Sequence, residues 1–127
     1  MILNRIVQAS ALRAASLPIP EEASAPESRA GIADLNIPRS LIGAITGSSG
    51  RNAVIAEMKP ASPSQGHIRT ITNPVSVARD LVAGGCCALS VITEPDFFHG
   101  TVAAIPAVRA GVGDIPVVGG FGRPNWE

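Results

Sequence analysis

A carboxylate and an ammonium group stand two residues apart at the end of a short apolar segment. The segment runs from Val54 to Met58, contains Glu57, and is followed directly by Lys59, the only lysine of the sequence. Because side chains alternate along a strand, Glu57 and Lys59 point to the same face. Such a pair can transfer protons or bind an anion. A buried structural ion pair is the alternative interpretation.

The segment after Lys59 is typical of an active-site loop. It reads PASPSQG over residues 60–66 and combines hydroxyl side chains with residues that favour turns. In α/β barrels, loops at the C-terminal ends of the strands build the active site. The opposite face of the preceding strand carries Val54, Ala56 and Met58, whose apolar side chains suit packing against helices.

The histidines and cysteines indicate no further chemistry. His67 and His99 have no partner at the spacing of metal ligands, so we expect loop or surface roles and no metal site. Cys86 and Cys87 are adjacent, which fits neither a disulfide framework nor a zinc site. We expect them to be small packing residues of a protein in the reducing cytoplasm.

Segments with strand and helix patterns alternate along the second half of the chain. Strands are predicted over 54–58, 88–93 and 115–118, and helices over 74–83 and 101–110. The strands begin about 30 residues apart, which is close to the average repeat of a barrel of eight βα units. Alternating strands and helices predict an α/β fold with a parallel sheet.

Two helices carry specific start signals. Asn73 is suited to cap the first helix, with Pro74 at its first position and Gly84 just after its end. Thr101 is the expected cap of the second helix, which places Pro106 in the helix interior. Because proline lacks an N–H and clashes with the preceding turn, we expect this helix to start late, at residue 105, or to kink.

The first half of the chain is predicted to be helical at two places. Residues 1–17 carry apolar side chains at a spacing of four, which predicts an amphipathic helix, with a transit peptide as the alternative. Residues 18–31 lack periodicity and predict a surface connection. A short helix is expected to begin near Pro38 with Asn36 as its cap. Its buried side would consist of Leu41, Ile42 and Ile45.

Composition narrows the classes of function. Ten basic and ten acidic residues give a formal net charge of zero, so nothing points to nucleic acid or a membrane surface as a partner. No apolar run approaches the roughly 20 residues that a membrane span needs. Hydrophobic residues make up 46% of the chain, which favours a folded core over disorder.

Several of these segments together resemble the indole-3-glycerol phosphate synthase family. Residues 57–66 (EMKPASPSQG) resemble its signature, an acid, an apolar residue and lysine before a loop of the form x-x-S-P-S-x-G. Residues 88–94 (ALSVITE) look like the family's second strand, and 97–100 (FFHG) like the motif that leads into its second helix. The N-terminal helix and residues 38–40 (PRS) are similar to the extension that precedes its barrel.

The resemblance implies a fold and a reaction. The fold would be a partial TIM (β/α)8 barrel, with residues 1–52 as a helical extension and linker and 53–127 as the first three strands. The family is a carbon–carbon carboxy-lyase of tryptophan biosynthesis. It converts 1-(2-carboxyphenylamino)-1-deoxyribulose 5-phosphate, a phosphorylated derivative of anthranilate, into indole-3-glycerol phosphate with loss of carbon dioxide and water. No metal or organic cofactor is implied.

The resemblance also assigns roles to four residues of this sequence. Lys59 would hold the carboxylate of the substrate and assist ring closure, and Glu57 would be its proton-handling neighbour. Ser62 would lie in the loop over the substrate, and Phe98 would contact its aromatic ring. A doubly anionic substrate needs cations, and ring closure needs the reacting atoms held together, so the chemistry agrees with these residue types.

The sequence departs from the family pattern at the end of the third strand. The family continues there with a lysine that is its principal general acid, whereas this chain reads GGFG over residues 119–122. Arg123 is a poor substitute because a guanidinium does not release a proton at neutral pH. We therefore expect a truncated or frameshifted form, or a fragment, that is inactive in the synthase reaction.

A catalytically dead α/β fragment with a structural or regulatory role is the second hypothesis. Three parallel strands cannot close a barrel, so both sheet edges would keep unpaired backbone groups and favour self-association. The inner face, for which Ile55, Leu89, Val91 and Val117 are the candidates, would lack the opposite wall of a barrel.

Overall fold

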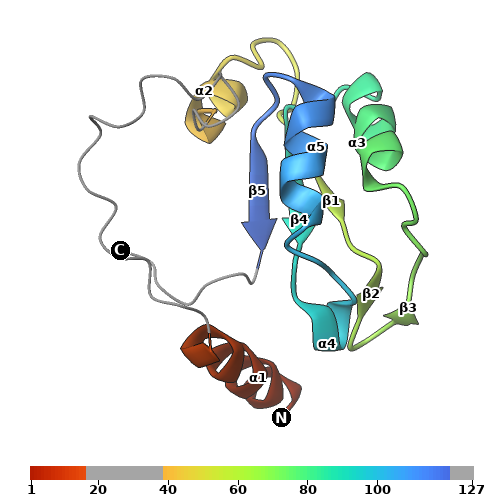
Figure 1. Cartoon of the computed structure of the whole chain (residues 1–127). Coiled ribbons are helices and arrows are strands. Elements are labelled where there is room, and N and C mark those ends of the chain that lie inside the picture. The colour runs from red at the N-terminus through yellow and green to blue at the C-terminus, as the bar shows by residue number, and fades with distance from the viewer. Residues whose placement is uncertain (17–38, 121–127) are drawn as a thin grey trace, which may run out of the picture.

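A parallel sheet of three strands forms the centre of the molecule. The computed structural model describes residues 1–16 and 39–120. Strands β1 (Ile55–Met58), β4 (Ala88–Ile92) and β5 (Val117–Gly120) lie in the order β1-β4-β5, and both neighbouring pairs are parallel (Figure 1). The C-terminal ends of all three strands therefore meet at one edge of the sheet.

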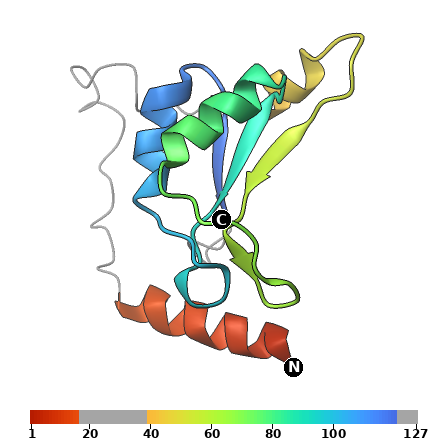
Figure 2. The same ribbon diagram turned by 90° about the vertical axis from the view of Figure 1, so that its right-hand side faces the viewer.

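Two helices cover one face of this sheet. Helices α3 (Pro74–Ala83) and α5 (Ala104–Val112) lie side by side on it (Figures 1 and 2). The core between sheet and helices consists of buried apolar side chains from every layer: Met58, Ala78, Cys86, Leu89, Val91, Ala104 and Val108. The predicted alternation of strands and helices and the parallel sheet are confirmed.

The register of the strands corrects the expected inner face. Leu89 of β4 pairs with Ala56 and Val117, and Val91 pairs with Met58. Paired residues of a sheet share a face, so Leu89, Val91 and Val117 belong to the face under the helices, and their placement on the inner face is wrong. Ile55 alone of the four lies on the other face, with 47% of its surface exposed.

The remaining strand predictions hold with three adjustments of their bounds, the smallest being that β4 ends at Ile92 rather than at residue 93. Ala56 and Met58 pack toward the helices as expected, whereas Val54 precedes the strand and is exposed. The third strand spans 117–120 rather than 115–118. Pro116 has no N–H for the ladder, and its carbonyl accepts the N–H of Leu89 at 2.9 Å just before the strand begins.

Helix α3 begins and ends as its sequence predicts. The Asn73 side chain accepts the N–H of Ser76 at 3.0 Å, Pro74 occupies the first position, and Gly84 follows the last. Helix α5 begins at Ala104, one residue before the delayed start expected from Pro106. Pro106 therefore lies in the first turn, where a missing N–H costs nothing. Thr101 is not the helix cap, because its hydroxyl instead accepts the N–H of Ala103 in the preceding turn.

The N-terminal half contributes two helices at opposite ends of the sheet. Helix α1 (Ile2–Ser16) lies across the C-terminal ends of the strands with Ile6 buried, and α2 (Leu41–Thr46) lies near their N-terminal ends (Figures 1 and 2). Ser40 caps α2, so the expected start near Pro38 is wrong, and Asn36 and Pro38 themselves lie outside the described residues. No helix of the described residues is long and apolar enough to span a bilayer.

The buried side expected for α2 is also wrong. Ile42 is 76% exposed and Ile45 is 40% exposed, while Leu41 is half-buried. A helix of six residues has fewer than two turns, so the spacing of its apolar residues says little about the face that is covered.

Candidate functional site

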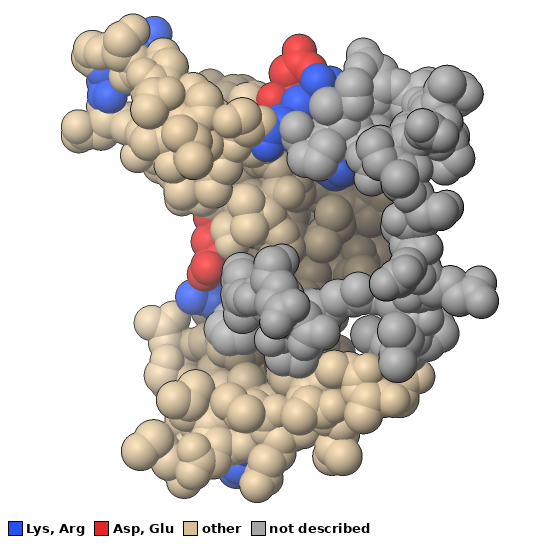
Figure 3. All heavy atoms as spheres, turned by 90° about the vertical axis from the view of Figure 1, so that its left-hand side faces the viewer, with Lys and Arg blue, Asp and Glu red and all other residues tan. Residues whose placement is uncertain are grey.

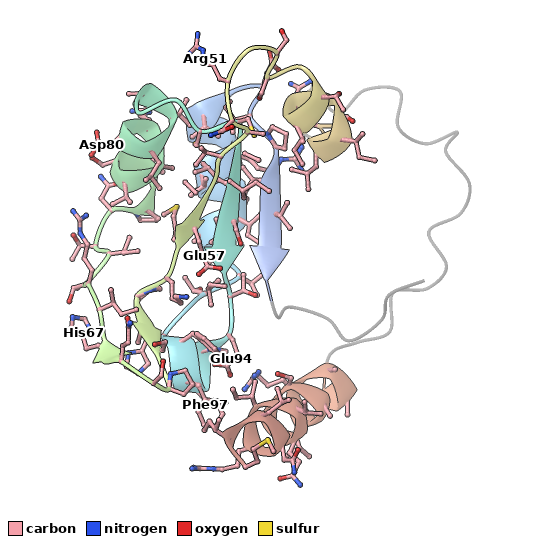
Figure 4. The ribbon with its side chains drawn as sticks, turned by 180° about the vertical axis from the view of Figure 1, so that it is seen from behind. Arg51, Glu57, His67, Asp80, Glu94 and Phe97 are labelled. Atoms are coloured by element: carbon pink, nitrogen blue, oxygen red, sulfur yellow. The ribbon has the colours of Figure 1, made fainter. Side chains whose placement is uncertain are left out.

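Glu57 and Lys59 form an ion pair at the C-terminal end of β1. The Nζ of Lys59 lies 2.7 Å from Oε1 of Glu57. The Lys59 side chain is 37% exposed and that of Glu57 is 41% exposed, so the alternative of a buried structural pair is wrong. Glu57 faces away from α3 and α5, toward the open side of the sheet (Figure 4). An ion pair that is open to solvent can exchange partners with an anionic ligand.

The loop after Lys59 folds into a small hairpin. Strands β2 (Ala61–Ser62) and β3 (Gly66–His67) pair in antiparallel fashion. The Ser62 hydroxyl accepts the N–H of Gln65 at 3.2 Å and lies 3.4 Å from the hydroxyl of Ser64. Ser62 is buried, and its hydroxyl stabilises the turn of this hairpin.

Phe98 reaches the site from the loop after β4. It ends the short helix α4 (Pro95–Phe98), which Glu94 caps. His99 then adopts a left-handed conformation with φ 55°, and the N–H of Gly100 donates to the carbonyl of Glu94 at 2.8 Å. A Cβ on Gly100 would lie 2.1 Å from the carbonyl oxygen of Ile92, so only glycine permits this close return of the chain.

Three of the four predicted site residues line one cavity. Lys59, Ser62 and Phe98 surround a hollow of about 560 Å³, together with Pro63, Ser64 and Gln65 of the hairpin and Ile2 of α1. Glu57 does not line the hollow but contacts Lys59 at its border. The hollow thus combines an ammonium group, hydroxyls and an aromatic ring, which suits an anionic aromatic ligand.

A second cavity lies between the sheet and the helices. It measures about 320 Å³ and is lined mainly by apolar groups, among them Met58, Val91 and Ala104. None of the four predicted site residues lines it, and it is the less suitable of the two for an anion.

The sequence interpretation missed two charged residues beneath the site. Glu94 is fully buried, and its carboxylate accepts the N–H groups of Asp96, Phe97 and Phe98 at 2.7–3.2 Å. The Nη2 of Arg13, on α1, lies 2.6 Å from Oε1 of Glu94. A signal for Glu94 was present, because an acidic residue directly before proline is typical of a helix N-cap. No local signal links Arg13 to a residue so distant in the sequence.

The other candidate groups lie outside the hollow. His67 is exposed and its Nε2 lies 3.2 Å from the hydroxyl of Thr70. Cys86 and Cys87 are free thiols, and burial raises the pKa of the Cys86 thiol. Within residues 1–16 and 39–120, no three acidic, histidine or cysteine side chains gather to hold a metal ion.

Parallel βα units with polar groups at the C-terminal ends of their strands are the arrangement from which α/β-barrel proteins build their active sites. A family model described as indole-3-glycerol phosphate synthase matches residues 4–119. The chain belongs to the indole-3-glycerol phosphate synthase family. The fold expected from the resemblance is thereby confirmed, with the three strands as part of a TIM barrel.

Named relatives agree with the family assignment. The indole-3-glycerol phosphate synthase of Rippkaea orientalis is 41% identical over 92 residues, which cover 72% of this chain and 31% of the relative. That of Rhodospirillum rubrum is 41% identical over 110 residues, or 85% of this chain and 39% of the relative. The chain spans about a third of the length of the curated relatives it matches.

Proposed function

We propose that the hollow lined by Lys59, Ser62 and Phe98 is the substrate site of an indole-3-glycerol phosphate synthase. Its ligand would be 1-(2-carboxyphenylamino)-1-deoxyribulose 5-phosphate, which the full reaction closes to an indole with loss of carbon dioxide and water. The observation that carries the proposal is that Lys59, Ser62 and Phe98, which come from two separate βα loops, line one hollow. Family membership supports the choice of substrate.

Each residue has a role that follows from its chemistry. The ammonium group of Lys59 would bind the carboxylate of the substrate and hold the aromatic ring near the carbon it attacks. Glu57, 2.7 Å away, would accept or return a proton as the ring closes. The Phe98 ring would lie against the ring of the substrate, and the Ser62 turn would cover it.

We propose further that turnover by this chain is slow or absent. In β5, Gly119 and Gly120 stand where the family resemblance places a lysine that acts as general acid, and Lys59 is the only lysine of the sequence. A positioned general acid contributes roughly 10²–10⁴ in rate.

A cytoplasmic location is part of the proposal and is supported by the two free thiols of Cys86 and Cys87.

Binding of the substrate to two single variants tests this function. Lys59→Ala should weaken the affinity, measured by the fluorescence of the aminobenzoate group, by roughly 10–100-fold, because one charge-assisted contact is lost. Arg51→Ala is the control, since this exposed cation lies at the other end of the sheet from Glu57 (Figure 4). Equal affinity of Lys59→Ala and the unsubstituted chain would show that Lys59 does not bind the ligand. Indole fluorescence in the same samples reports turnover.

Self-association is the second candidate function, with another copy of this chain as the partner. Within residues 39–120, β1 and β5 each pair with β4 alone, so each leaves one edge of backbone groups unpaired. Ile55 and Val118, on the open face of the sheet, are 47% and 39% exposed; Figure 3 shows the molecule from this side. These features support pairing of two sheets through their edges.

A further inference from the structure

The cap of helix α4 depends on a carboxylate that is removed from water. Glu94 has no exposed surface, and its two oxygens accept three backbone N–H groups, that of Phe98 at 3.2 Å among them. A buried carboxylate is costly unless hydrogen bonds and an opposite charge surround it. Helix α4 has only four residues and does not persist by itself. The position of Phe98 therefore depends on how well the Glu94 carboxylate is neutralised.

The neutralising charge comes from α1. Arg13 contacts Glu94 through Nη2 at 2.6 Å, and its Nη1 donates to the exposed carboxylate of Asp96. A third contact, from Nη2 to the Ser10 hydroxyl at 3.2 Å, orients the guanidinium. Arg5 adds a second link, with its guanidinium 5.6 Å from the centre of the Phe97 ring. Figure 4 shows Glu94 and Phe97 on the side of α4 that faces α1.

Both helices that this ion pair joins contribute a residue to the lining of the hollow. Ile2, at the start of α1, lines it together with Lys59 and Phe98. The ion pair thus holds two walls of the hollow: α1, which carries Ile2, and α4, which ends at Phe98. Loss of the pair would displace both walls without altering Lys59 itself.

We propose that Arg13 and Glu94 are positioning residues that fix the aromatic wall of the substrate hollow by joining α1 to α4. The inference rests on the proposed function for the identity of the ligand. The joining of the two helices is independent of the ligand and has its own measurement.

The experiment compares two arginines of similar exposure, one paired with the buried Glu94 and the other with the exposed Asp114. Arg13→Gln removes the charge beside Glu94. Arg39→Gln is the matched control, because Arg39 is equally half-buried, at 30% against 33%, and pairs with Asp114 away from the hollow. Two quantities are measured on the whole chain: amide hydrogen exchange at Phe97, Phe98 and along α1, and the affinity for 1-(2-carboxyphenylamino)-1-deoxyribulose 5-phosphate.

We expect Arg13→Gln to accelerate exchange at Phe97, Phe98 and α1, and to weaken the affinity, each by about tenfold or more, as for the loss of one charge-assisted hydrogen bond. Arg39→Gln should change neither. Glu94→Gln should shift both quantities at least as far as Arg13→Gln, because it also weakens the cap of α4. Arg13→Lys keeps the charge beside Glu94 and should restore part of both quantities, since one ammonium group replaces the two guanidinium nitrogens.

Two outcomes would overturn the proposal, and a third would overturn the proposed function alone. Exchange in Arg13→Gln no faster than in Arg39→Gln would show that the pair does not hold α4. Faster exchange with unchanged affinity would make the pair structural only. If the unsubstituted chain binds no substrate, the proposed function fails, and the exchange rates still decide whether Arg13 and Glu94 join the two helices.

Discussion

The adjacent thiols of Cys86 and Cys87 differ in their surroundings and therefore in reactivity. Cys86 belongs to the apolar core, and burial, followed by the neighbouring Cys87, raises the pKa of its thiol. Because the thiolate is the reactive form, we expect the Cys87→Ser variant, which keeps Cys86, to react with iodoacetamide about tenfold or more slowly than Cys86→Ser. Mass spectrometry of the modified chains gives both rates. Equal rates would show that Cys86 is not protected.

The same shift predicts how stability depends on pH. A thiol whose pKa is raised by folding binds its proton more tightly in the folded chain than in the unfolded chain. Its contribution to the free energy of unfolding is therefore complete below pH 9.0, the ordinary pKa of the thiol. It is lost as the pH rises above that value. Between about pH 8 and about pH 10, the free energy of unfolding should fall more in the unsubstituted chain than in Cys86→Ala.

At the scale of the helices, Gly111 sets how closely α3 and α5 approach. A Cβ on Gly111 would lie 2.4 Å from Cγ1 of Val75, and Arg79 Nε donates to the Gly111 carbonyl at 3.1 Å. Alanine in place of helical glycine gains about 1 kcal/mol, but overpacking costs about 1–3 kcal/mol. We expect Gly111→Ala to lower the free energy of unfolding by about 1 kcal/mol in urea titrations. In the Val75→Ala background the same change should stabilise the chain, and a loss there would contradict the clash.

The elements that the sequence predicted well are those with strong local signals. Helix α3 has a capping Asn73 and a first-turn Pro74, and β4 is apolar at four of its five positions. The pair of Glu57 and Lys59 followed from strand alternation alone. What failed depended on distant contacts. The face of β4 is set by its register against β1, and that of β5 by its register against β4. Arg13 contacts Glu94 across 81 residues of sequence, and no local pattern indicates that contact.

At the scale of the whole molecule, the open sheet edges predict the assembly state. If β1 or β5 pairs with the same edge of a second copy, sedimentation should show a dimer or larger species whose proportion rises with concentration. Substitution of Val118→Lys, on the exposed side of the edge strand β5, should shift the distribution toward the monomer, since an edge charge opposes pairing. A monomer at every concentration would exclude self-association.

The long separation between Arg13 and Glu94 has a consequence for biosynthesis. Arg13 leaves the ribosome 81 residues ahead of Glu94, which at usual translation rates is a delay on the order of ten seconds. Throughout that interval α1 lacks its ion-pair partner on α4. Its side chains Leu3, Val7 and Leu12, which stay exposed even after docking, are available to other binders. Helix α1 is therefore a segment of this chain that stays open to a ribosome-associated chaperone until α4 has been made.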